Sequence, residues 1–576
     1  MHAGHARRPI TMVIGSSSRI LRAQLRARNF RRNYSRQTSR TSGGSRKWAG
    51  PAVALLGTFT AATAAYVWKS QQGTPEAQPS RRVEKVTFEK SKINTSVTEE
   101  RNREILSAQH AQIKKMSANP GVYVWGSNSH GVVDPDSKEA IIKEPRRLRY
   151  FEGQFLRDIK LDQTSGAAVT QNGDLVQWGQ GYSETDFQPT PTLTGKNLVK
   201  ISMSRDRIIA LSSNGNVYSV PISKTDQQSG SKPSEGSWVP GWSSRARISY
   251  RQLAPQLGLG EKVTSISSGL EHVLLLTNAG RVFSAAAATE AYPSRGQLGV
   301  PGLTWATRPK GPVDYCHELS TLKDSKIVQI ATGDFHSLLL DKNGRVFSFG
   351  DNSVGQLGFE YDPASPMVDK PTQLPIKGLY SNKNWSAHIT SIAAGGYTSF
   401  ITVDAVRKLL TDGTFASTTQ GVPSVDTWAF GRGIHGALGN GKWTHFQDSP
   451  SKMKALSGLS EYDEKTQKLQ PIRPVQISVG ATHAAAVLGN NAHLNNAKKS
   501  SIADITWGQD TLWWGGNESL QVGTGKRSNV PTPTHILPPP DIATSTNLDE
   551  ARFQIIPGNQ RIECGRQVTA VYSVKA

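Results

Sequence analysis

Two glycine-rich stretches have the residue types of nucleotide-binding loops. Residues 431–436 read GRGIHG, the G-x-G-x-x-G spacing that opens a helix in dinucleotide-binding folds. Here the stretch continues as ALG, which matches a phrase repeated elsewhere in the chain, so we predict a loop. Residues 523–528 read GTGKRS, and Arg527 stands where a phosphate-binding loop needs Ser or Thr. We therefore predict no cofactor at either stretch.

Three histidines occupy the same slot in three copies of one phrase: His272, His336 and His483. A metal site needs converging ligands, whereas equivalent slots of different repeats lie apart, so we predict buried imidazoles hydrogen-bonded to nearby backbone. Cys316 and Cys564 allow one bridge at most and indicate no cysteine-based metal site. No nucleophile–base spacing is visible, so we predict no metal, no catalytic residues and no enzyme activity. A triad assembled from separate repeats stays open.

The repeated phrase is clearest at residues 326–350, KIVQIATGDFHSLLLDKNGRVFSFG. It predicts a strand, a tight turn, a second strand, a hairpin and a third strand. Asn343 and Gly344 suit a type I′ turn, which needs a positive φ at both residues. Copies recur at intervals of 42 to 85 residues, which indicates a repeat architecture. The equivalent positions are Asp162, Ser204, Gly269, Gly333, Gly396, Gly480 and Gly565.

A second half of the phrase, GDNSVGQLG at 350–358, recurs as GRGIHGALG at 431–439 and GGNESLQVG at 515–523. Units of short strands with apolar edges are most simply closed into a ring. Residues 122–131 are a second half without a first half before it, and residues 561–574 are a first half without a second half after it. We predict that the two pair and complete the seventh blade of an all-β propeller over residues 120–576.

The full phrase resembles the regulator of chromosome condensation repeat, whose members form seven-bladed β-propellers. The matching residues in the best copy are Gly333, His336, Leu340, Gly344, Val346, Gly350, Asn352, Gly355, Gln356 and Gly358. The copy near residue 200 departs from the pattern, because Ser204 and Arg207 replace Gly and His. We expect a structural role within blades for Gly269, His272, Gly333, His336, Gly344, Gly350, Gln356, Gly358, Gly396, Gly431, Gly436, Gly480, His483, Gly515 and Gly565.

The first 47 residues carry twelve Lys and Arg and no Asp or Glu, the composition of a mitochondrial transit peptide. We predict a transit peptide over residues 1–34, cleaved between Tyr34 and Ser35 with Arg32 three residues before the cut; a basic arm for nucleic acid or lipid is the alternative. Residues 49–68 are twenty uncharged residues, about 30 Å as a helix, and predict one inner-membrane span. A secretory signal anchor fits less well, because more than forty arginine-rich residues precede the span.

Residues 70–118 predict a polar linker with a helix at about 97–117, whose few apolar positions favour a stalk over a docked element. Since twelve of the +22 net charges lie in the leader, only +10 remain for the rest of the chain, and a nucleic-acid partner is not favoured. Three insertions, 221–250, 405–426 and 488–506, predict long loops that are surface disorder or contact sites.

Leader, span and propeller together resemble the fungal mitochondrial inner-membrane members of the family, which are associated with assembly of respiratory complex III (cytochrome bc1). The resemblance implies a membrane-anchored interaction scaffold with protein partners such as complex III subunits or assembly intermediates. Two alternatives stay open: a guanine-nucleotide exchange factor for a mitochondrial GTPase, as for the family's founder, and a matrix RNA- or mitoribosome-binding propeller. Basic residues on both sides of the span leave the propeller in either the intermembrane space or the matrix.

Overall fold

The computed structural model describes residues 108–576, except 237–242, 290, 377, 381–384, 408–409, 412–413, 416–422, 464–466, 491–506, 544–550 and 576. They all belong to one compact unit, 92–576. The predicted transit peptide with Arg32, Tyr34 and Ser35, the predicted span 49–68 and the first part of the linker lie outside the described residues. Within the described ranges, no helix is long and apolar enough to cross a membrane.

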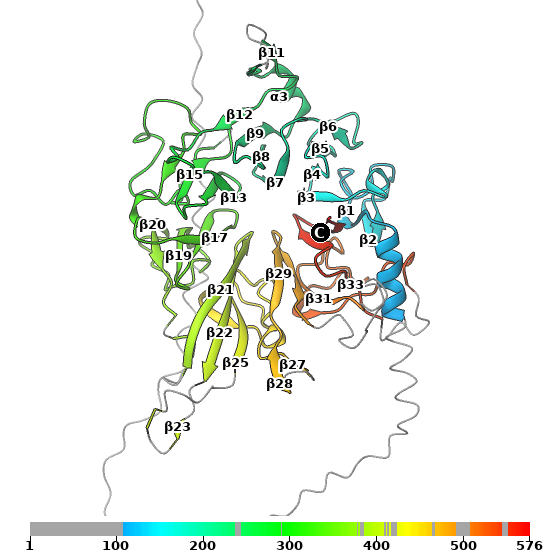
Figure 1. Cartoon of the computed structure of the whole chain (residues 1–576), viewed down its shortest axis with the longest axis vertical. Coiled ribbons are helices and arrows are strands. Elements are labelled where there is room, and N and C mark those ends of the chain that lie inside the picture. Colours follow the sequence, from blue (N-terminus) through cyan, green and yellow to red (C-terminus); the bar gives the residue numbers. More distant parts are fainter. Residues whose placement is uncertain are drawn as a thin grey trace, which may run out of the picture. The chain divides into compact units, whose positions relative to one another are not determined.

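Seven antiparallel sheets of four main strands are arranged around a centre (Figure 1). Blade 1 holds β3 (Leu156–Leu161), β4 (Gly166–Thr170), β5 (Leu175–Trp178) and β6 (Thr190–Pro191). Blade 2 holds β7 (Leu198–Met203), β8 (Arg207–Ser212), β9 (Val217–Pro221) and β12 (Arg251–Leu253). Blade 3 holds β13 (Val263–Ser268), β14 (His272–Thr277), β15 (Val282–Ala286) and β16 (His317–Glu318). Blade 4 holds β17 (Ile327–Thr332), β18 (His336–Asp341), β19 (Val346–Asp351) and β20 (Met367–Gln373).

Blade 5 holds β21 (Trp385–Gly395), β22 (Thr398–Arg407), β25 (Pro423–Gly431) and β26 (Gln447–Lys452). Blade 6 holds β29 (Pro474–Val479), β30 (His483–Leu488), β31 (Gln509–Gly515) and β32 (Val530–Thr534), with β33 (Gln554–Ile555) beside β31. Blade 7 holds β34 (Gln560–Cys564), β35 (Val568–Ser573), β1 (Val122–Ser127) and β2 (Ile141–Arg147). The connections add η1 (Arg149–Phe151), α3 (Lys224–Ser229), β10 (Ser234–Gly236), β11 (Ser243–Arg245), η2 (Ser320–Leu322), β23 (Leu410–Thr411), β24 (Thr414–Phe415), η3 (Lys454–Leu456), β27 (Ser460–Asp463) and β28 (Lys468–Pro471).

The first strand of each blade lies at the centre and contacts the first strands of both neighbouring blades, so that β34 meets both β29 and β3. Six of these seven inner strands carry a bulge, near the beginning of five of them and in the middle of the longer β21. The apolar cores lie between adjacent blades. For example, Leu274 and Leu276 of blade 3 pack with Leu339 and Phe349 of blade 4. Each blade therefore depends on its neighbours for burial of its faces.

The ring is closed by strands from opposite ends of the described chain. β1 pairs with β35 in a continuous antiparallel register from Val122 opposite Tyr572 to Gly126 opposite Val568. β2 then pairs with β1, and β34 with β35, so blade 7 has two strands from each end, and Figure 1 shows the marked C-terminus near β1. The prediction of a seven-bladed propeller completed by both ends is confirmed.

The turn after each inner strand approaches the next blade closely, which explains its small residues. A Cβ added at Gly565 would lie 2.1 Å from the carbonyl oxygen of Leu161 in blade 1, and one added at Gly480 would lie 2.3 Å from the carbonyl oxygen of Gly565. Backbone groups of neighbouring blades also bond here: the Ala481 amide donates to the Gly565 carbonyl at 3.2 Å. Any side chain at Gly565 pushes blades 7 and 1 apart.

Each of the three histidines hydrogen-bonds to a hydroxyl of the next blade, where the sequence predicts backbone. The Nε2 to Oγ distance is 2.9 Å from His272 to Ser337 and 2.8 Å from His336 to Ser399, and His483 lies 2.7 Å from the Thr569 Oγ1. The Ser399 hydroxyl donates its proton to the Gln356 carbonyl at 2.8 Å, so the His336 Nε2 must be the donor toward Ser399. The neutral ring therefore joins two blades.

Burial lowers the pKa of His336 to about 4 and the pKa values of His272 and His483 to about 3. These rings stay neutral in the folded protein, whereas in the unfolded chain they take up a proton near pH 6.5. Protonation therefore favours the unfolded chain, and the stability linked to the neutral rings is present above pH 6.5 and falls as the pH drops toward 4.

The hairpin between β18 and β19 differs from the predicted type I′ turn. Gly344 has a φ of +74°, but Asn343 has no positive φ. The Asp341 carboxylate accepts hydrogen bonds from the backbone amides of Asn343 at 2.9 Å and Arg345 at 2.8 Å. These bonds hold the two residues before Gly344 in a right-handed turn, and Gly344 alone takes the left-handed position, as in a longer hairpin loop.

The described part of the predicted helix, residues 108–118, packs against blade 6. Ile113 and Met116 are buried, and the side-chain amide of Gln112 donates to the Gln554 carbonyl at 3.1 Å. Met116 belongs to the same apolar cluster as Phe553. The sequence favours a stalk because the apolar residues are few. For residues 108–118 that prediction is wrong, because Ile113 and Met116 are both buried and suffice to dock these turns on the propeller.

We predict that Gly565→Ala destabilises the propeller by about 1–3 kcal/mol, because the new methyl group overlaps the Leu161 carbonyl. The free energy of unfolding in urea measures this loss. Gly378→Ala is the matched control, since a Cβ there meets nothing within 4 Å. Equal stabilities for the two variants would contradict the close contact between blades 7 and 1.

We predict that His336→Gln flattens the pH dependence of stability by about 1.4 kcal/mol per pH unit between about pH 6 and pH 4.5, because one fewer ring gains a proton on unfolding. Urea unfolding at several pH values measures the slope. Ser399→Ala, which removes the partner hydroxyl and leaves the ring, is expected to lower stability while preserving most of the slope. An unchanged slope in His336→Gln argues against a neutral ring in the folded protein.

Candidate functional site

One mouth of the central channel is crossed by an arginine. Arg566 follows β34 of blade 7, and its Nε lies 3.2 Å from the Asp162 carboxylate of blade 1. Its Nη2 lies 3.2 and 3.3 Å from the two carboxylate oxygens of Asp334 in blade 4. No two blades of a seven-membered ring lie further apart than 7 and 4. Arg566 therefore reaches across the mouth and joins opposite sides of the ring.

Burial shifts the pKa values of Asp334 and Arg566 toward their neutral forms, and their ion pairing opposes these shifts. Burial raises the pKa of Asp334, and the Arg566 charge counteracts part of that rise. Burial lowers the pKa of Arg566, but the Asp334 and Asp162 carboxylates outweigh it, and the pKa is raised overall. The cluster is an ion-pair network in which each charge has a partner, so removal of one member would leave a buried charge unpaired.

Deeper in the channel, the Lys160 ammonium lies 2.6 Å from the Glu563 carboxylate and links blade 1 to blade 7. Burial raises the pKa of Glu563, while the Lys160 charge opposes this rise. Asp158 accepts a hydrogen bond from the Ile201 amide of blade 2 at 2.9 Å and one from the Tyr572 hydroxyl of blade 7 at 3.3 Å. These charged groups bind neighbouring blades together at the point of closure.

The glycines and the glutamine that the sequence singles out lie at the ends of strands or in the turns and loops that join them. Gly269, Gly333, Gly480 and Gly565 follow inner strands, and Gly396 follows Gly395 at the end of β21. Gly350, the last residue but one of β19, has a φ of +110°, and Gly431 and Gly515, the last residues of β25 and β31, have φ values of +106° and +107°. Gly344 lies in a hairpin, and Gln356, Gly358 and Gly436 lie in the loops before fourth strands. Residues 432–436 and 523–528 form loops and turns. A structural role for this set remains a prediction.

A groove of about 710 Å³ runs along β2, the outermost strand of blade 7. β2 is paired on one side only, and Pro145 removes one backbone donor from it. The loop that follows β32 contributes Pro540 and Asp541 to the groove. Its charged lining residues are Asp134, Glu139, Lys143, Glu144, Arg146, Arg147, Arg149, Glu152 and Asp541.

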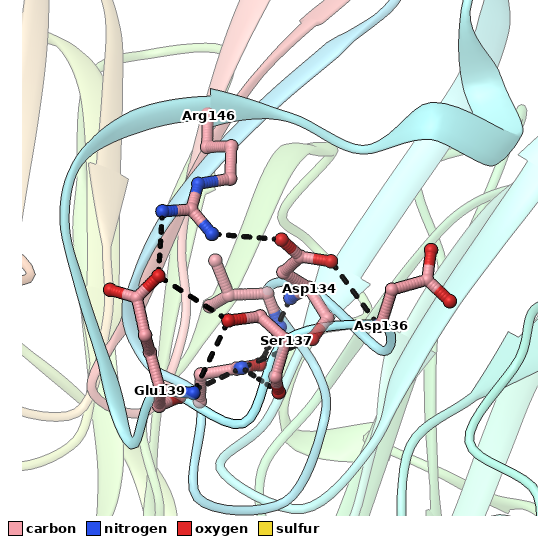
Figure 2. Close-up of polar contacts among 7 residues, drawn as sticks. Asp134, Asp136, Ser137, Glu139 and Arg146 are labelled. Carbon is pink, nitrogen blue, oxygen red and sulfur yellow. Dashed lines mark hydrogen bonds and ion pairs between the residues drawn. The ribbon is translucent and has the colours of Figure 1, made fainter.

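Figure 2 shows Arg146 of β2 between two carboxylates of the preceding loop. Its Nη1 lies 2.9 Å from Asp134 and its Nη2 lies 3.0 Å from Glu139. Ser137 lies between them and accepts a hydrogen bond from the Glu139 amide at 3.2 Å. Since Arg146 and Glu139 are largely exposed, the pairs add little stability. Their effect is to hold the loop over the groove in one shape.

Arg147 holds the other wall of the groove. Its guanidinium lies over the Tyr123 ring at 4.8 Å, and its Nε is 3.1 Å from both the Tyr123 hydroxyl and Asp541. Its Nη2 donates to the Asn119 carbonyl at 3.0 Å. Burial raises the pKa of Tyr123, so its hydroxyl stays neutral. Arg147 thus connects blade 7, blade 6 and the segment after residues 108–118.

Four exposed charged residues along the groove, Lys143, Glu144, Arg149 and Glu152, have no ion-pair partner among the described residues. Lys143 and Glu144 alternate along β2, and Arg149 and Glu152 follow it. The sequence gives no signal for this groove, because the residues lie outside the repeated phrase. The cluster of charged residues between 134 and 152 is the only sequence feature from which the groove could have been suspected. The groove can bind a segment of mixed charge, and its residues suggest no covalent chemistry.

Comparisons with known proteins agree with the fold. Two models of the regulator of chromosome condensation (RCC1) repeat match residues 327–356 and 343–402. The first match falls on blade 4, where the repeated phrase is best preserved, and the second runs from blade 4 into blade 5.

The chain is similar to mitochondrial proteins of two organisms. Protein FMP25, mitochondrial, of Saccharomyces cerevisiae is 27% identical over 364 residues, 58% of this chain and 57% of that protein, so the match spans little more than half of the yeast protein. RCC1 domain-containing protein RUG3, mitochondrial, of Arabidopsis thaliana is 24% identical over 381 residues, 64% of this chain and 73% of that protein.

Among solved structures, Prp20p from Saccharomyces cerevisiae, described with its binding to Gsp1p and histones, has a TM-score of 0.50 and 19% identity. The likeness covers 79% of this chain and 92% of that one, and at this identity it shows the fold alone. Repeats, ring and relatives agree: this chain is a seven-bladed propeller with regulator of chromosome condensation repeats matched at residues 327–402, and it is similar to a mitochondrial protein of yeast.

Proposed function

We propose that this protein is a non-enzymatic interaction scaffold of the mitochondrion. The groove along β2 carries the proposal, because it combines a firmly held wall with exposed charges that have no partner among the described residues. Charges at such a rim select a partner and speed its encounter more than they add affinity. The mitochondrial relatives support the compartment.

The client is proposed to be a subunit or assembly intermediate of respiratory complex III. This step rests on the resemblance of the leader, the apolar stretch and the propeller to fungal inner-membrane members of the family. A client segment that carries both positive and negative residues fits the alternating Lys143 and Glu144. The predicted span at 49–68 would tether the scaffold to the inner membrane.

A GTPase partner is the second candidate. Its support is the binding of Gsp1p by Prp20p, which has the same fold. Release of a fluorescent guanine nucleotide from mitochondrial GTPases, with and without the propeller, separates an exchange factor from a scaffold that only binds.

We predict that the double variant Lys143→Glu with Arg149→Glu lowers crosslinking to complex III subunits about tenfold, because both changes reverse charges at the rim of the groove. Crosslinking and quantitative mass spectrometry in intact mitochondria measure the yield. Lys442→Glu, an exposed lysine in blade 5, is the matched control. An unchanged yield in the double variant excludes the groove, and crosslinks without any respiratory-chain protein exclude this client.

We predict that the chain resists carbonate extraction from mitochondrial membranes and that deletion of residues 49–68 releases it, because these twenty uncharged residues are long enough to cross the bilayer as a helix, whereas the other long uncharged stretches, 384–403 and 474–497, contain strands of blades 5 and 6. Immunoblotting of pellet and supernatant shows the difference. Protease treatment of mitoplasts then reports the side, since a propeller in the intermembrane space is cleaved and one in the matrix is protected. Extraction of the intact chain by carbonate would refute the tether.

A further inference from the structure

In blade 2, Arg207 occupies the slot that His272, His336 and His483 hold in their blades. It begins β8, and only 9% of its surface is exposed. In the described part of the chain, Arg207 is the only Lys or Arg that is buried. A buried guanidinium cannot shed its charge and therefore needs a partner.

The next blade cannot supply the partner that the histidines find. Each histidine meets a hydroxyl one residue after the same slot of the following blade, as His272 meets Ser337. For Arg207 the corresponding residue is Val273, which has no hydroxyl. The guanidinium bonds instead to Ser219 of its own blade, with 3.1 Å from Nε to the hydroxyl and 3.4 Å from Nη2 to the carbonyl.

No carboxylate among the described residues lies within ion-pair distance of Arg207. Burial lowers its pKa, and the positive charge of Arg251 lowers it further, while the more distant carboxylates of Asp206, Asp314 and Asp226 oppose these shifts only in part. Both Ser219 contacts are to neutral oxygens, and Nη1 makes no hydrogen bond with a described residue. An uncompensated buried charge is strongly destabilising, so its presence calls for an explanation beyond packing.

A cavity of about 450 Å³ opens beside this guanidinium. α3 contributes Asp226, the segment before β12 contributes Tyr250, and the loop after β15 contributes Thr289. Arg251 lines it as well, although its Nη1 is engaged by Asp314 at 3.4 Å. The cavity thus offers one cation without an ion-pair partner among the described residues, and its wall also contains hydroxyl, aromatic and proline groups and the carboxylates of Asp206 and Asp226.

We propose that this cavity receives a carboxylate of a partner protein, an acidic side chain or a chain terminus, on Arg207. The end of the guanidinium that carries Nη1 can bind both oxygens of a carboxylate. A phosphate dianion fits less well, because Asp206 and Asp226 place negative charge on the same wall. This inference rests on the proposed scaffold function and gives it a second, chemically defined contact.

Isothermal titration of the full chain in nonionic detergent tests the site with defined probes at constant ionic strength. N-acetylglycine represents a chain terminus, N-acetylaspartate methylamide an acidic side chain, and its asparagine counterpart the neutral control; inorganic phosphate is the fourth probe. We expect saturable binding of at least one carboxylate probe, and binding about tenfold weaker or absent for the neutral probe and phosphate.

Arg207→Gln is expected to weaken carboxylate binding about tenfold or more, and Arg207→Lys to weaken it less, because lysine keeps the charge but loses the planar fork. Arg473→Gln, an exposed arginine paired with Asp404, is the matched control and should bind normally. Without ligand, the melting temperature of Arg207→Gln should be unchanged or higher, since an unpaired buried charge has been removed.

Three results with the unchanged chain overturn the proposal: no saturable binding of either carboxylate probe, equal binding of the neutral probe, or phosphate binding as tight as that of the carboxylates. Full binding by Arg207→Gln also overturns it. If that variant fails to fold, the comparison between the carboxylate and neutral probes on the unchanged chain still decides. None of these measurements uses a client, so failure here leaves the crosslinking test of the proposed function unaffected.

Discussion

The pairing of β1 with β35 is the constraint on which the rest of the propeller depends. An open array of seven blades would leave two faces without cover and two inner strands without neighbours. Once β1 and β35 pair, β34 contacts β3, Gly565 meets Leu161, and the Lys160–Glu563 pair forms across the junction. The ends of the chain thus give the ring a continuous wall of hydrogen bonds and buried charges.

Several polar groups near the centre of the ring follow one rule: a neighbouring blade supplies a hydrogen-bond or ion-pair partner. The histidines meet hydroxyls, Asp158 meets backbone and a phenol, and Arg566 meets carboxylates on two blades. The low dielectric of such sites strengthens satisfied bonds and penalises unpaired groups. Arg207 departs from this rule among the described residues, and the groove on β2 departs from it at the surface. Both departures lie where another molecule can reach, which is why they carry the functional arguments.

The sequence predicts the fold well because the repeated phrase encodes both periodicity and closure. A first half and a second half at opposite ends have only one arrangement that covers every blade face. Local chemistry was harder to predict. The Asp341 side chain changes the turn at Asn343. Met116 packs in one cluster with Phe553, more than four hundred positions away, and Ile113 lies beside Gly508.

The candidate sites depend even more on context. The sequence shows that Arg207 stands where the repeat has His. That its guanidinium lacks a partner in the next blade depends on Val273, and that it can reach a ligand depends on the cavity beside α3. The groove has no pattern at all, because its walls come from β2, the loop before it and the loop after β32. The spacing of charges along β2 cannot predict the groove, because residues of another blade form part of its lining.

The shared seventh blade has a consequence for biogenesis. β1 and β2 come first among the strands in chain order, and β34 and β35 come last. During synthesis or passage across a membrane, β1 and β2 emerge first, and the edge of β1 that later pairs with β35 has unpaired backbone hydrogen-bonding groups. More than four hundred further residues must follow before β34 and β35 are available. The propeller therefore cannot be completed blade by blade from the N-terminal side, because blade 7 needs strands from both ends. A chain that is incompletely synthesised or incompletely translocated therefore needs a chaperone to cover the edge of β1 until β34 and β35 are available.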